Sequence, residues 1–176
     1  MKITHTILLT FFLILGTNIQ AQSYSSSKKG DIVDIASKVD DLSTLVAAVK
    51  AADLVKTLKS DGPFTVFAPV NEAFEALPEG TVETLLKPEN KKMLQSILTY
   101  HVVSGKFNAT DVISAIKKND GSFKITTVQG GVLYAMIKDG NVVLKDEKGG
   151  MSTVIKTDVS TSNGVVHLLD TVVMPE

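Results

Sequence analysis

Apolar and polar residues follow two different periods along this chain. From Asp31 to Lys118, apolar side chains mostly recur every three or four residues, and from Ser122 onward they mostly alternate with polar ones. The first period predicts amphipathic helices, and the second predicts half-buried strands. Helices followed by a meander of strands predict an α+β fold with an antiparallel sheet.

The stretch that organises the chain is Phe64–Leu77, F-T-V-F-A-P-V-N-E-A-F-E-A-L. Its first residues, Phe64–Ala68, form a continuous apolar run, which is typical of a strand covered on both faces. Pro69 ends this strand because proline cannot donate to a ladder. Asn71 is a predicted N-cap for a short helix, and Phe74 is expected to face the core of the protein.

Several further helices are predicted from the spacing of apolar residues. Asp31 and Asp41 are suitable N-caps for the first two, and Asn108 or Thr110 for the last. Met93 belongs to the apolar stripe of the helix that starts at a proline. The predicted ranges are Asp31–Val39, Asp41–Leu58, Thr81–Leu86, a helix starting at Pro88, and Ala109–Lys118.

The predicted strands are bounded by short turns that contain glycine, asparagine or aspartate, residues that tolerate positive φ angles. One strand follows the helix that starts at Pro88, and five more make up the meander. The predicted strands after the central stretch are Tyr100–Val103, Phe123–Val128, Val132–Lys138, Val142–Lys145, Met151–Val159 and Val165–Met174.

The first 21 residues have the pattern of a cleaved secretory signal peptide. Lys2 precedes the apolar run Ile7–Leu15, and small and polar residues lead to a cleavage position after Ala21. The run is far shorter than the roughly 20 residues that span a bilayer, so no integral membrane segment is expected after cleavage. Residues 22–30 form a polar, serine-rich tether that is expected to be flexible, and residues 31–176 form a single domain. The expected localisation is secreted or periplasmic.

Composition excludes several classes of function. The chain has no cysteine, so disulfides and thiolate chemistry are absent. It also has no arginine, and without Lys2 it carries 17 lysines against 19 acidic residues, a net charge of −2. A near-neutral protein without arginine is poorly suited to nucleic acid, so no nucleic-acid partner is expected.

No catalytic constellation is recognisable. The chain contains no G-x-S-x-G, P-loop, H-E-x-x-H or dinucleotide-binding pattern. His101 and His167 lie among apolar residues of predicted strands, where a histidine usually has a structural role. We therefore expect no enzyme, no metal and no cofactor. An enzyme acting on extracellular polymers would need a cleft with paired carboxylates, and the sequence cannot place such a pair in space.

Three blocks of the sequence resemble the fasciclin (FAS1) domain family. They are T-V-F-A-P-V-N-E-A-F from Thr65, L-T-Y-H-V-V from Leu98, and N-G-V-V-H-L-L-D-T-V-V-M-P from Asn163. The resemblance extends from Asp31 to the C-terminus and implies a compact wedge of β-sheets with helices packed on it. Val70 departs from the family, where threonine or serine is usual. The motif residues expected to form the fold are Thr65, Phe67, Ala68, Pro69, Asn71, Phe74, Asn163, Gly164, His167 and Asp170.

The resemblance also implies a function in cell adhesion, matrix association or host contact. Two segments are implicated in the family: a Tyr-His pair, matched by Tyr100 and His101, and an Asp-Ile pair, matched in place by Asp158 and Val159. The expected partner is an extracellular or envelope protein or polysaccharide, and a monomer is expected. An alternative is a carrier that holds a carotenoid- or lipid-like molecule in an apolar cleft, as some family members do.

Overall fold

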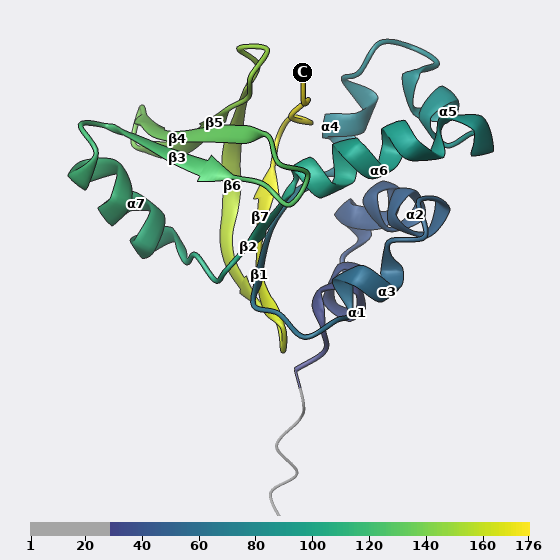
Figure 1. Ribbon diagram of the computed structural model, residues 1–176, viewed down its shortest axis with the longest axis horizontal. Helices are drawn as coiled ribbons and strands as arrows, with labels where there is room; N and C mark the ends of the chain where they lie inside the picture. The colour runs from purple at the N-terminus through teal and green to yellow at the C-terminus, as the bar shows by residue number, and fades with distance from the viewer. Residues whose placement is uncertain (1–28) are drawn as a thin grey trace, which may run out of the picture.

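The computed structural model describes residues 29–176, so the predicted signal peptide and nearly all of the tether lie outside the described residues. Seven strands form a sheet in the order β2-β1-β7-β6-β5-β4-β3 (Figure 1). The strands are β1 Phe64–Pro69, β2 Val102–Ser104, β3 Ser122–Thr126, β4 Val132–Lys138, β5 Asn141–Lys145, β6 Met151–Ser160 and β7 Gly164–Leu169.

The first and last strands pair in parallel. β1 and β7 run side by side over their whole length, with Val66 opposite Val166, whereas every other pairing in the sheet is antiparallel. The α+β class is confirmed, but the expectation of a purely antiparallel sheet is wrong at this pairing. A pattern of apolar residues indicates which segments are strands, and it carries no information on their relative direction.

The sheet is divided into two arms by the long strand β6. Two register shifts interrupt the pairing of β6 with β7, one after Val154 and one after Lys156. Such irregularities bend a strand and increase its twist. As a result β3, β4 and β5 diverge from β1, β2 and β7, and the two arms form a wedge (Figure 1).

Two hydrophobic cores lie on opposite faces of β1. Val66 and Ala68 face the layer of helices, while Phe67 faces the space between the two arms of the sheet. This double burial confirms the interpretation of the continuous apolar run. The helices are α1 Ile32–Ala36, α2 Ser43–Ala51, α3 Val55–Leu58, α4 Asn71–Glu75, α5 Thr81–Leu85, α6 Lys91–Tyr100 and α7 Ala109–Lys118, with 3-10 turns at Asp40–Leu42 and Pro88–Asn90.

The helix predicted over Asp41–Leu58 is broken into three pieces. Asp41 lies inside a 3-10 turn and does not act as an N-cap, whereas Asp31 does cap α1 as predicted. Asp53 adopts a left-handed conformation with φ 56°, and the Leu54 N–H donates to the Val49 carbonyl at 3.0 Å. This is a Schellman ending, which usually requires glycine. An aspartate in that position gives no sequence signal for the end of a helix.

Three other predicted features differ in detail. Tyr100 is the last residue of α6, and the following strand starts only at Val102. Met93, predicted to face inward, is 58% exposed. The final strand ends at Leu169, well before Met174, because the chain turns away after it. Two of these differences concern the ends of elements, which local sequence defines least well. The third concerns which face of α6 is buried.

Asn71 caps a helix other than the one predicted. Its side-chain oxygen accepts the Thr44 N–H at the start of α2, at 3.0 Å, and its amide donates to the Asp40 carbonyl, also at 3.0 Å. The N-cap of its own helix α4 is Val70, which makes no side-chain capping bond. The hydroxyl that family members usually carry at position 70 is thus missing at a helix N-terminus.

We predict that Asn71→Ala lowers the free energy of unfolding by about 1–2 kcal/mol, the usual cost of a lost N-cap. Urea unfolding followed by circular dichroism measures this. Asn141→Ala is the matched control, because Asn141 is exposed and starts β5. We expect it to change stability by less than about 0.5 kcal/mol. Equal effects of the two substitutions would contradict the capping role.

Candidate functional site

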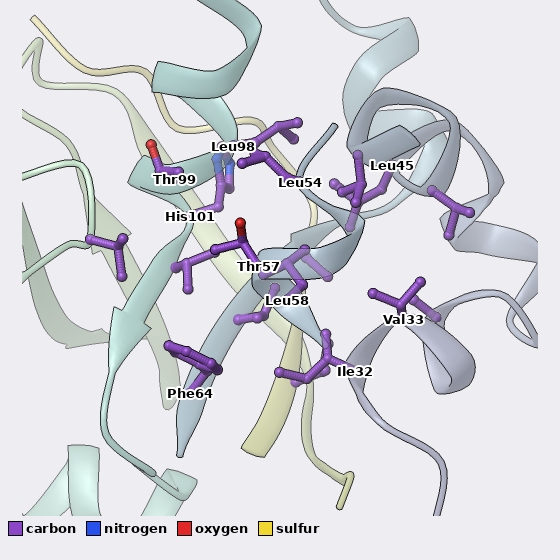
Figure 2. Close-up of a pocket in the computed structure, with 18 residues that line it drawn as sticks. Ile32, Val33, Leu45, Leu54, Thr57, Leu58, Phe64, Leu98, Thr99 and His101 are labelled. Atoms are coloured by element: carbon purple, nitrogen blue, oxygen red, sulfur yellow. The ribbon is translucent and has the colours of Figure 1, made fainter. Parts of the chain in front are cut away.

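An apolar pocket lies between the helices α1, α2, α3 and α6 and the strands β1, β2 and β7 (Figure 2). Its volume is about 50 Å³. Thr57 and Val128 are exposed residues of its lining and mark its mouth. The lining consists of Ile32, Val33, Ala36, Leu45, Val46, Val49, Leu54, Thr57, Leu58, Phe64, Val66, Ala68, Leu98, Thr99, His101, Val102, Val128 and Val166.

The side chains that line this pocket are almost all apolar. Among the described residues, Thr57, Thr99 and His101 are the only polar side chains that line it, and the Thr99 hydroxyl already donates to the Gln95 carbonyl at 2.7 Å. The pocket can therefore hold an apolar group but offers little to orient a polar one. A dry cavity that binds benzene has a volume of roughly 150 Å³. A larger ligand would need the helices to move outward.

Tyr100 is fully buried in the wedge between the two arms of the sheet. Its hydroxyl donates to the Val132 carbonyl at 2.6 Å and accepts the Glu147 N–H at 3.3 Å. Burial raises the pKa of Tyr100 to about 12. The side chain thus connects the end of α6 to β4 and to the loop after β5, and it presents no surface to a macromolecule.

His101 is 2% exposed and both of its ring nitrogens are occupied. Nδ1 lies 2.8 Å from the Ile97 carbonyl, so it must carry the proton, and Nε2 accepts the Val173 N–H at 3.3 Å. Burial lowers the pKa of His101 from 6.5 to about 4. A neutral histidine joining a helix end to the C-terminal segment fits a structural role.

Asp158 and His167 form one hydrogen-bonded group with the start of α7. The Asp158 carboxylate accepts the Ala109 N–H at 2.9 Å, and the Asp158 N–H donates to His167 Nδ1 at 3.3 Å. His167 Nε2 donates to the Phe107 carbonyl at 2.8 Å. Burial lowers the pKa of His167, which keeps the ring neutral. Asn108 is the N-cap of α7, one of the two residues predicted for that role, and Asp158 adds a bond from a distant strand to the first N–H of the helix.

The remaining motif residues hold segments of the fold together. Thr65 Oγ1 donates to the Gly105 carbonyl at 2.7 Å and accepts the Phe107 N–H at 2.9 Å. The Asn163 side chain accepts the Ile32 N–H at 3.0 Å and donates to the Leu58 carbonyl at 2.8 Å.

Asp170 holds β6 in the same way, by accepting the Thr153 N–H at 2.7 Å. Burial alone would raise the pKa of Asp170, but the hydrogen bonds from Thr153, Thr171 and Ser152 together lower it. The Asp170 carboxylate is therefore ionised and bonded to the backbone of another segment, as the side chains of Thr65 and Asn163 are.

The four candidate interaction residues do not form one exposed surface in the structure. Tyr100 and His101 are buried, Val159 is half-buried, and Asp158 is exposed on β6. Sequence reasoning offered an apolar cleft as an alternative without naming its lining, which comes from segments far apart in the chain, and it missed the bond from Asp158 to the start of α7. An unusual left-handed φ of 59° at Asp158 marks the site in the structure, but aspartate gives no such signal in a sequence.

Residues 29–176 contain no group of three histidine, cysteine, aspartate or glutamate side chains placed to hold a metal ion. Over the same residues, no helix combines the length and apolar character required to span a bilayer.

Stability is expected to depend on pH through His101. The unfolded histidine has a pKa near 6.5 and the folded one about 4, so the unfolded state binds more protons between these values. Stability should therefore fall as the pH drops from about 6.5 to 4, by on the order of 3 kcal/mol from this residue. Urea unfolding across this range measures the slope.

The variant His101→Gln should unfold more easily at pH 7 and show a shallower slope, because glutamine does not titrate. A wild-type slope retained in full by His101→Gln would show that another group controls the acid sensitivity. Unchanged stability at pH 7 would contradict the structural role of this histidine.

This chain is similar in sequence to several known proteins. A protein from Synechocystis, sll1483, is 51% identical over 144 residues, covering 82% of this chain and 73% of that protein. Transforming growth factor-beta-induced protein ig-h3 from Sus scrofa is 36% identical and is matched over 83% of this chain but only 19% of its own length.

A solved FAS1 domain pair from the insect cell adhesion molecule fasciclin I superimposes with a TM-score of 0.72 at 16% identity, covering 82% of this chain and 50% of that one. The sequence model of the fasciclin domain family matches residues 40–175 of this chain. With the three sequence blocks and the wedge fold in agreement with it, the chain belongs to the fasciclin domain family.

Proposed function

We propose that this chain is a non-enzymatic binding domain that acts outside the cytoplasm and attaches another macromolecule to the cell surface or matrix. The observation that supports this proposal is an exposed bulge in the middle of β6, Ile155–Asp158, at the position that the family associates with adhesion. The export pattern of the first 21 residues and the lack of cysteine are consistent with an extracytoplasmic protein.

The bulge offers both apolar and polar groups to a partner. Ile155 is 54% exposed, and Lys156 and Thr157 are also exposed. β5 pairs with β6 only from Met151 to Thr153, so within the described residues the rest of β6 has a neighbouring strand on one side alone. An exposed apolar side chain beside a free strand edge is a common feature of protein contact sites.

The bulge is held in place before any partner binds. Asp158 is tied to α7 through Ala109 and to β7 through His167. A preorganised surface loses less conformational entropy on binding than a flexible one. Under this proposal, Asp158 and His167 position the contact residues, and Tyr100 and His101 support the fold beneath it.

We predict that Ile155→Ser and Lys156→Ala reduce retention of envelope and matrix material from the source organism on bead-coupled protein. Both side chains are exposed, so thermal stability should hardly change. Met93→Ser is the matched control, because Met93 is equally exposed but lies on α6 in the helical layer. Mass spectrometry and sugar analysis identify the retained material.

Full retention by the Ile155 and Lys156 variants would exclude the bulge as the contact site. Loss of retention in the Met93 variant as well would indicate nonspecific adsorption. Asp158→Ala is less informative, since losing its bond to the first N–H of α7 should also lower stability.

The apolar pocket supports a second candidate function, the transport of a hydrophobic small molecule. The supporting observation is its lining, in which apolar side chains from four helices and three strands converge with few polar groups. Short helices can separate from a sheet more readily than long ones, because each buries little surface. Such movement would enlarge the pocket for a carotenoid- or lipid-like ligand.

We predict for this candidate that protein purified from the source organism carries an apolar molecule, detected by native mass spectrometry. Ala36→Leu, which adds bulk inside the pocket, should remove that mass. Ala51→Leu is the control, since Ala51 is exposed at the end of α2 and does not line the pocket. A folded wild-type protein without a bound molecule would count against the carrier.

A further inference from the structure

One face of the arm formed by β3, β4 and β5 is open. Helix α7 covers the other face, where Val112 and Ile116 pack with Leu133 and Ala135 of β4 (Figure 1). Residues of β4 alternate between the two faces, so Tyr134 and Met136 point away from α7. Tyr134 is 38% exposed, and Lys124 and Thr126 of β3, on the same face, are also exposed.

Two lysines flank Tyr134 on this open face. Lys124 of β3 lies directly opposite Tyr134 in the register of the sheet, and Lys145 of β5 lies opposite it on the other side. Directly paired residues share a face, and neighbouring strands are about 5 Å apart. The row therefore presents a phenol ring between two ammonium groups, and in the next row the half-buried Met136 is paired with the buried Val143.

The lysines of this part of the protein are available to a ligand. None of the eight lysines from Lys106 onward forms an ion pair within residues 29–176. Five of the eight acidic residues in the same part instead accept backbone N–H groups. These are Asp111, Asp146, Glu147, Asp158 and Asp170.

The open face is hollowed beside this row. The hollow has a volume of about 500 Å³ and is lined by Ser122, Tyr134, Met136, Lys145, Asp146, Glu147 and Glu176. Glu147 and Glu176 place negative charge at one end, and Lys145 places positive charge near the ring. Hydroxyl groups can donate to both glutamates, so a ligand that carries hydroxyls beside its negative charge matches this hollow better than one whose polar groups are phosphates.

We propose that this open face binds a polysaccharide built from uronic acids. The apolar face of a sugar ring would lie on Tyr134, its carboxylate would pair with Lys124 and Lys145, and hydroxyls would donate to Glu147 and Glu176. Each group of the sugar thus has a matching feature on the protein. The Tyr134 ring matches its apolar face, the lysine ammonium groups match its carboxylate, and the glutamate carboxylates match its hydroxyls. The surface is on other strands than the β6 bulge, so this proposal and the function proposed above can fail separately.

Titration of the chain (residues 22–176) with polygalacturonate, by isothermal calorimetry at low and moderate salt, tests the proposal. We expect saturable binding that weakens with salt, and an about tenfold loss in the double variant Lys124→Gln/Lys145→Gln. Tyr134→Ala should lose a similar amount. Lys87→Gln/Lys92→Gln is the matched control, since both lysines are exposed in the helical layer and neither forms an ion pair with a residue of the described range 29–176.

The polymer itself supplies a second control. Fully methyl-esterified polygalacturonate keeps the sugar chain and removes its charge, so it should not bind. Equal binding of both polymers, equal loss in the two lysine double variants, or tighter binding of oligothymidylate would overturn the proposal. Retention of envelope material that depends on Ile155 without any affinity for polygalacturonate would overturn this inference and leave the proposed function standing.

Discussion

The parallel pairing of β1 with β7 is the constraint on which the rest of the fold depends. It places both ends of the domain in one sheet, and its two faces carry the two hydrophobic cores. The ladder starts where backbones meet closely: a Cβ on Gly164 would lie 2.0 Å from the Phe64 carbonyl oxygen. Only glycine fits there, so the closing block needs it for a steric reason.

Distant polar side chains complete the fold by capping helices. Asn71, from the start of α4, accepts an N–H of α2, and Asp158, from β6, accepts one of α7. In both cases a donor that the helix cannot satisfy itself is bonded by another segment. Each cap therefore fixes the position of a helix as well as its end, which a local cap does not do.

These contacts also change how the family's adhesion residues should be understood. Tyr100 and His101 hold α6 against β4 and the C-terminal segment, and their burial removes them from direct contact with any partner. Under the proposed function, substituting them would alter binding only through the fold. Under the same proposal, Ile155 and Lys156, which are exposed beside Asp158, are the residues whose substitution should alter binding and leave stability unchanged.

Local patterns in the sequence determined the class of the fold and most of its elements. The apolar run at Phe64–Ala68, the stripe of α7 and the alternation in β4 each depend on neighbouring residues only, so the period alone reveals them. The three blocks likewise identified the family, since glycine, proline and histidine occur there at steric or hydrogen-bonding positions.

The tertiary structure decided what depends on residues far apart. The direction of β7, the partner of Asn71, the left-handed end of α2 at Asp53 and the apolar pocket all result from packing between distant segments. The same holds for the row of Lys124, Tyr134 and Lys145, which requires the register of three strands. Strand register and long-range contacts depend on how much apolar surface the whole chain buries in each arrangement. A local pattern of residues does not contain that information.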